Sequence, residues 1–210
     1  MRIIGLLAVL SLALLSGCST TMTAEECIAS DWRTVGYEDG VLGRSGAQIG
    51  NYRKACADAG VTPDLNEYQA GRQQGLEEYC RPQNGYRVGE RGASYQGVCP
   101  AALEGQFLAA YEEGRTLHTL RTDVRRLESA IVRAENEIED IDATIEAETV
   151  RMISDGLTPE ERLEILAEMK RLSARKESLE NDLIYLAEEL GASRERLDDY
   201  RAMQAAALVD

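Results

Sequence analysis

The sequence predicts an all-α protein with a small disulfide-bonded helical domain followed by a long antiparallel coiled-coil hairpin. Three observations support this fold class. The first half of the 210-residue chain is rich in Gly, Tyr and Cys, glycine becomes rare after Gly114, and apolar residues then recur at alternating steps of four and three. The formal net charge of -14 disfavours a nucleic-acid partner, because phosphate binding needs clustered Lys and Arg.

The beginning of the chain predicts export. Arg2 followed by the apolar run 3–15 is typical of a signal peptide, and the run is shorter than the roughly 20 residues that span a membrane. Leu15-Ser16-Gly17-Cys18 has the pattern of a bacterial lipobox, in which the segment 1–17 is removed and Cys18 carries the lipid.

We therefore expect residues 18–22 to form a lipidated linker whose acyl chains, such as palmitate, anchor the protein durably in a membrane. Ser19 follows the lipobox cysteine, which predicts the outer membrane and a position facing the periplasm. Ordinary secretion, with Cys18 unmodified, is the alternative.

The other four cysteines, Cys27, Cys56, Cys80 and Cys99, all lie in the first half. An even number in an exported chain predicts two disulfides. Three pairings are possible, and we favour the sequence neighbours, Cys27 with Cys56 and Cys80 with Cys99. A zinc site is less well supported because the chain has no CxxC pair and a single histidine. We expect no metal and no cofactor.

Two motifs recur in the first half. The pattern GYxxGxxG occupies 36–43 and 85–92, and YxxGR occupies 68–72 and 111–115. Each YxxGR tyrosine stands twelve residues after a cysteine. We interpret the order as a degenerate tandem duplication.

The motifs predict helix packing more than chemistry. Tyr68, Gly71 and Gly75 share one helix face, where bare backbone lets a second helix approach closely. Ligand-binding glycine loops are the alternative, but the GxGxxG and P-loop spacings are missing. The predicted packing residues are Tyr37, Gly40, Tyr68, Gly71, Tyr86, Gly89, Tyr111 and Gly114.

Short helices are expected over 23–42, 47–59 and 64–80 and from residue 100 onward. Thr23 and Glu26 form a capping box at the first of them. Around Asn84-Gly85 we expect a turn followed by irregular backbone. These segments make up a domain over 23–115.

The region 116–210 carries the coiled-coil pattern in two arms. One apolar series runs from Leu120 to Met152 and the other from Ile165 to Tyr200. Only Glu148 interrupts the first series, and Lys176 and Ser193 interrupt the second.

A reversal is predicted at 154–159. Gly156 can end one helix in the left-handed conformation, and Thr158, Pro159 and Glu161 provide a capping box with proline at the first helical position. One uninterrupted rod is the alternative. The seam alone leaves pairing into a four-helix dimer open.

No catalytic constellation emerges from the sequence. His118 has no serine or cysteine motif beside it and is interpreted as a solvated surface residue. The acidic pairs 38–39, 77–78 and 112–113 could suggest glycoside hydrolysis, but such pairs are usually solvated. Arg72 and Arg115 could bind a carboxylate or a glycan, although pairing with a nearby acidic residue is the simpler expectation.

The cysteine and glycine framework resembles an exported proteobacterial family, domain of unknown function 2799, over residues 22–117. The residues that carry the resemblance are Cys27, Asp31, Trp32, Gly36, Tyr37, Asp39, Gly40, Gly43, Cys56, Tyr68, Gly71, Gly75, Tyr79, Cys80, Asn84, Gly85, Gly89, Gly92, Tyr95, Cys99 and Pro100. The resemblance implies no activity or catalytic residues. It does imply a lipoprotein, since members of this family often are.

The sequence thus predicts a non-catalytic envelope lipoprotein that acts as a structural or protein-interaction module. Its expected partners are the membrane, through the lipid, and another protein or a second copy, through the coiled coil. A peptidoglycan-binding or glycan-cleaving protein is one alternative. An accessory subunit of an efflux or secretion assembly is another.

Overall fold

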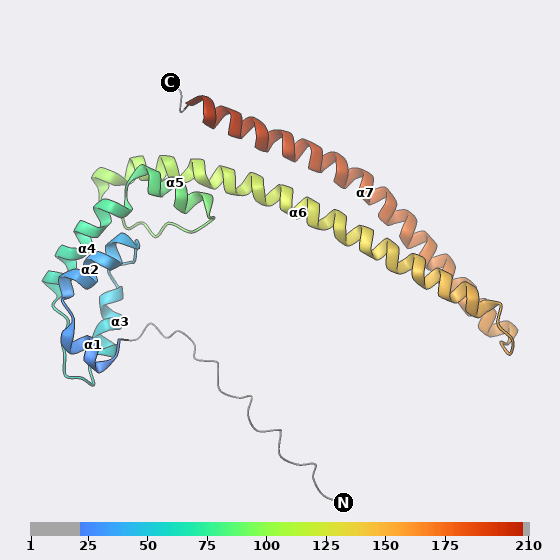
Figure 1. Cartoon of the computed structure of the whole chain (residues 1–210), viewed down its shortest axis with the longest axis horizontal. Coiled ribbons are helices and arrows are strands. Elements are labelled where there is room, and N and C mark those ends of the chain that lie inside the picture. Colours follow the sequence, from blue (N-terminus) through green and yellow to red (C-terminus); the bar gives the residue numbers. More distant parts are fainter. Residues whose placement is uncertain (1–21, 208–210) are drawn as a thin grey trace, which may run out of the picture. The chain divides into compact units, whose positions relative to one another are not determined.

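The computed structural model describes residues 22–207, so the predicted signal peptide and Cys18 lie outside the described part. The described residues form helices and no strands (Figure 1). The helices are α1 (Ala24–Ala29), α2 (Trp32–Val41), α3 (Gln48–Ala55), α4 (Leu65–Tyr79), α5 (Pro82–Glu90), α6 (Ala101–Met152) and α7 (Pro159–Ala207). The predicted all-α fold class is confirmed.

The chain divides into two compact units. Among the described residues, the first unit contains 22–85 together with Ser94–Ala109, and the second contains Tyr86–Ala93 and 110–207. The sequence placed the boundary between 115 and 116. The long helix α6 runs through that position without interruption, so its first turns belong to the first unit and the rest to the second.

The first unit has a small core closed by a disulfide. Trp32, Tyr52 and Tyr68 are buried there with Ile49 and the Cys27–Cys56 pair. Such tyrosines suit a semi-polar core because the ring is buried while the hydroxyl finds a hydrogen-bond partner.

The first predicted helix is in fact two helices. The Asp31 side chain accepts hydrogen bonds from the backbone N–H of Arg33 and from the hydroxyl of Thr34. These bonds cap α2 and end the continuous helix that the sequence predicted over 23–42. The capping box of Thr23 and Glu26 is present at α1, as predicted.

The prediction of irregular backbone around Asn84-Gly85 is wrong. Both residues lie in α5. Glycine and asparagine have low helix propensity, but Gly85 fits against the backbone of Phe107 in α6, where a Cβ would overlap the carbonyl oxygen. Packing against another helix therefore outweighs local propensity here.

The second unit is an antiparallel helical hairpin. In Figure 1, α7 returns alongside α6 after the reversal, and its 49 residues correspond to an axial length of about 74 Å. Two apolar clusters fill the seam. One centres on Leu117, Val124, Leu127, Leu190 and Leu197, and the other on Ala134, Ile141 and Leu179.

The reversal forms as the local signals predict. Gly156 has a φ of 91°. The Thr158 hydroxyl accepts a hydrogen bond from the N–H of Glu161, and the Glu161 carboxylate accepts one from the N–H of Thr158. Arg162 then donates to the carbonyl groups of Met152 and Ser154, which satisfies acceptors at the end of α6.

The two polar side chains that interrupt the apolar series of α7, Lys176 and Ser193, each bind a charged side chain. Lys176 forms an ion pair of 2.6 Å with Asp142 in α6, and buried Ser193 accepts a hydrogen bond from Arg196. Among the described residues, none of the helices is both long and apolar enough to cross a membrane.

Candidate functional site

The first set of predicted packing residues joins α2 to α4. A Cβ at Gly36, Gly40, Gly71 or Gly75 would lie well inside 3.0 Å of backbone atoms of the opposite helix. The two backbones are therefore in direct contact, as the motif predicted. Tyr68 is fully buried, whereas the Tyr37 side chain is 42% exposed and contributes its backbone to the contact.

The second set repeats this arrangement between α5 and α6. A Cβ at Gly89 would overlap the Tyr111 carbonyl oxygen, and a Cβ at Gly114 would overlap that of Tyr86. Tyr111 is buried, and the hydroxyl of half-buried Tyr86 donates to Gln204 of α7. Both copies of the motif thus serve close helix packing.

The two copies also end their first helix in the same way. Gly43 and Gly92 have φ values of 67° and 72°. The N–H of Arg44 bonds to the carbonyl of Asp39, and the N–H of Ala93 bonds to that of Val88, which is the same five-residue spacing. A left-handed glycine with this bond defines a Schellman end.

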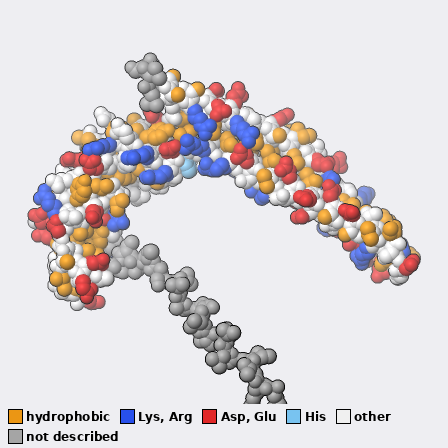
Figure 2. Space-filling view, in the orientation of Figure 1, with side chains coloured by type: hydrophobic (Ala, Val, Ile, Leu, Met, Phe, Trp, Pro, Cys, Tyr) orange, Lys and Arg blue, Asp and Glu red, His pale blue; other side chains and the backbone are white. Residues whose placement is uncertain are grey.

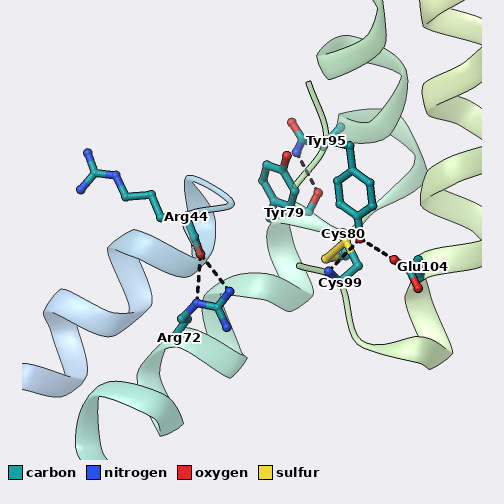
Figure 3. Close-up of a disulfide and its surroundings, with 8 residues drawn as sticks. Arg44, Arg72, Tyr79, Cys80, Tyr95, Cys99 and Glu104 are labelled. Carbon is teal, nitrogen blue, oxygen red and sulfur yellow. Dashed lines mark hydrogen bonds between the residues drawn. A yellow bond between two sulfur atoms is a disulfide. The ribbon is translucent and has the colours of Figure 1, made fainter. Parts of the chain in front are cut away.

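The disulfides join Cys27 to Cys56 and Cys80 to Cys99. These are the pairings that we favoured among the three possible ones. The second disulfide attaches the segment before α6 to the end of α4 (Figure 3). Beside it, the Tyr95 hydroxyl donates to Glu104 and accepts from the N–H of Cys99.

A buried carboxylate lies under the α2–α4 contact. Asp39 is 1% exposed and accepts hydrogen bonds from the hydroxyl groups of Tyr52 and Tyr68 and from the guanidinium of Arg44. Three donors on one carboxylate compensate for its burial. The expectation that the acidic pair 38–39 is solvated is wrong for Asp39, which is buried.

The electrostatics of this cluster are those of a structural network. Burial, together with the bond to Asp39, raises the pKa of the Tyr68 hydroxyl well above its usual range. Burial also raises the pKa of Tyr52. The three donors to Asp39 and the two tyrosine hydroxyls thus form a buried structural hydrogen-bond network.

A surface pocket of about 510 Å³ lies in the first unit, and its lining includes Tyr68 and Cys99 of the second disulfide. Its lining comprises Gly46, Tyr68, Gln69, Arg72, Gln73, Leu76, Val98, Cys99 and Pro100. Arg72 donates from Nε and Nη2 to the carbonyl oxygen of Arg44 at 3.0 and 2.8 Å (Figure 3). The expected pairing of Arg72 with an acidic residue is therefore replaced by a bond to backbone.

A second surface of interest surrounds the hairpin reversal. Four large apolar side chains are exposed near the ends of α6 and α7, namely Val150 at 62%, Ile153 at 76%, Leu163 at 66% and Leu166 at 47%. Hydrophobic atoms lie among acidic ones at this end of the hairpin in Figure 2. We call these four residues the tip cluster.

Other sequence candidates do not come together as a reactive site. His118 is half-buried, not solvated as predicted, because its ring packs on Gly92 and bonds to the carbonyl of Glu90.

The acidic pairs 77–78 and 112–113 are exposed. Arg115 lies over the Tyr111 ring at 5.9 Å. Within residues 22–207, no group of three or more His, Cys, Asp or Glu residues is arranged to hold a metal ion.

Fold and site together define a disulfide-bonded helical protein in which glycine-paired helices lead into a coiled-coil hairpin. Residues 31–116 match the model of a family described as "Protein of unknown function (DUF2799)", which confirms the resemblance drawn from the cysteine and glycine framework. The hairpin from residue 117 onward lies outside the matched segment. No curated protein and no solved structure matches the chain.

Proposed function

We propose that the protein is a non-catalytic lipoprotein of the bacterial envelope whose hairpin binds another protein through the tip cluster. The main support for this proposal is that large apolar side chains are exposed at the reversal, although apolar residues already fill the seam between the two helices. Exposed apolar groups gathered in one region are typical of interaction surfaces.

Side chains of α6 and α7 fill the apolar seam between the two helices. Apolar clusters fill the seam along its length, and four ion pairs join α6 to α7. These pairs are Arg126 with Glu189, Glu128 with Arg194, Glu137 with Arg175, and Asp142 with Lys176. The coiled coil therefore needs no second hairpin to bury its apolar stripe, which disfavours a four-helix dimer.

The charge around the tip cluster indicates the kind of partner. Residues 146–168 contain seven acidic side chains and two arginines. Both arginines are engaged within the hairpin, since Arg151 pairs with Glu148 and Arg162 bonds to carbonyl groups at the end of α6. Two such acidic tips would repel each other, which disfavours a second copy as the partner. We propose a partner with an apolar surface bordered by Lys and Arg.

The predicted anchor suits this role. Cys18 precedes the first residue of α1, Ala24, by six positions, a span of about 20 Å when fully extended. A lipid on Cys18 would keep the disulfide-bonded helices close to a membrane and leave the hairpin in the periplasm. Palmitate incorporation that is lost in Cys18→Ser tests the anchor separately.

Photocrosslinking in the native cell tests the tip. A photoreactive amino acid replaces Ile153 or Leu163, and Ile184 is the matched control because its side chain is 60% exposed on α7, away from the reversal. We expect adducts from the two tip positions, with cross-linked peptides that are apolar and flanked by Lys or Arg. Adducts only with a second copy, or equal adducts from position 184, would contradict the proposal.

A further inference from the structure

We propose that the pocket beside Arg72 binds a small ligand through its carboxylate. This site lies in the first unit and does not depend on the proposed role of the hairpin tip. The pocket's volume of about 510 Å³ is within the range of small-molecule sites, roughly 300–1,000 Å³. It accommodates an amino-acid-sized or sugar-sized acid.

The lining selects for negative charge. The chain has 37 acidic and 23 basic residues, yet the only charged residue in this lining is Arg72. Gln69 and Gln73 flank it with amide groups, which donate and accept hydrogen bonds. Leu76 and Pro100 add apolar surface. A cation flanked by amides and apolar groups fits a carboxylate that carries a small polar body.

The guanidinium is already oriented. Two of its nitrogens donate to the Arg44 carbonyl, and this bond fixes the plane of the group. Gly46 stands over the guanidinium, with its ideal Cβ position 3.7 Å from both Cζ and Nη1. Arg72 forms no ion pair with an acidic side chain in residues 22–207.

The second copy of the motif provides an internal contrast. Its YxxGR segment has Glu112 where the first copy has Gln69, and Thr116 where the first has Gln73. Its arginine, Arg115, lies over the Tyr111 ring and bonds to the Tyr111 hydroxyl. Helix packing is common to both copies, whereas the uncharged amides around a carbonyl-fixed arginine occur only in the first. Packing alone therefore leaves this feature unexplained.

Ligand-observed NMR titrations of the full chain in detergent test the site. One pair of probes is N-acetyl-alanyl-alanine and its C-terminal amide, and the other is glucuronic acid and its methyl ester. We expect saturable binding of at least one acid and none of its neutral counterpart, up to about 10 mM, ten times the constant of a weak ~1 mM complex. The two pairs distinguish a peptide carboxylate from a sugar acid.

The variant Gln69→Glu tests whether the acid binds at Arg72. It places a carboxylate three residues from Arg72 on an exposed helix position, where Glu112 in the second copy shows that the motif accepts glutamate. We expect about tenfold weaker binding or more, the size of one charge-assisted hydrogen bond. Glu112→Gln is the matched control and should leave the affinity unchanged. Equal binding of acid and neutral probe, no saturable binding, or unchanged affinity in Gln69→Glu would overturn the proposal.

Discussion

Gly71 of α4 lies so close to Arg33 of α2 that a Cβ at position 71 would overlap the Arg33 carbonyl oxygen. Glycine in a helix ordinarily costs about 1 kcal/mol relative to alanine. Here that cost is offset because the bare backbone allows the two helices to meet and to bury the Tyr68 ring. The same relationship recurs between Gly114 and Tyr86 in the second unit.

Gly71→Ala should therefore destabilise the protein. We expect a loss of about 1–3 kcal/mol, the cost of forcing extra volume into a packed contact, measured by urea unfolding. Gly50→Ala is the matched control because Gly50 is helical with no atom within 4 Å of its Cβ position. That variant should be stabilised by up to about 1 kcal/mol. Equal effects from the two substitutions would contradict backbone contact.

Removing the buried carboxylate should also destabilise the first unit. Asp39→Ala leaves two tyrosine hydroxyls and the Arg44 guanidinium without their common acceptor. We expect a loss of about 3 kcal/mol or more in the free energy of unfolding. Glu38→Ala, at the exposed neighbour, should change it by less than about 0.5 kcal/mol.

The raised pKa of Tyr68 predicts sensitivity to alkaline pH. The fold favours the protonated hydroxyl, so its pKa is higher in the folded than in the unfolded chain. The corresponding stability is fully present below the unfolded value, about 10, and is lost as the pH rises above it. Urea unfolding between about pH 8 and 11 should show this decline, and Tyr68→Phe should reduce it. Tyr185→Phe, at a 72% exposed ring, should not.

Each disulfide should stabilise the folded chain by a similar amount. The paired cysteines are 29 and 19 residues apart, for which loop-closure entropy gives about 3.6 and 3.2 kcal/mol. Replacing either pair with serine should lower the midpoint of chemical unfolding accordingly. A pair whose loss left the midpoint unchanged would show that its loop is already restricted in the unfolded chain.

Local signals predicted the parts of the structure that local chemistry determines. The Gly156 reversal and the Thr158 cap depend on residues within one turn, and the favoured disulfides join sequence neighbours. The break before α2 carried a signal as well, because Asp31 is a good N-cap residue, but the apolar pattern on either side obscured it.

Long-range packing determines what the sequence could not indicate. α5 contains Gly85 and Gly89, and their helical conformation depends on contact with α6. Asp39 adjoins Glu38 in a pair that looks solvated, and only the fold brings Tyr68, 29 residues later, onto its carboxylate. Arg72 likewise finds its acceptor 28 residues away, at a backbone carbonyl that no side-chain pattern reveals.

Partner capture by tip variants tests the central claim most directly. The double substitution Ile153→Asp with Leu163→Asp adds charge at exposed positions, so the fold should be retained while docking onto an apolar surface is lost. With the photoreactive amino acid at Leu166, we predict that the amount of partner protein cross-linked to the full-length chain falls at least about tenfold in this variant and is unchanged in Ile184→Asp. Undiminished capture by the double variant would contradict binding through the tip.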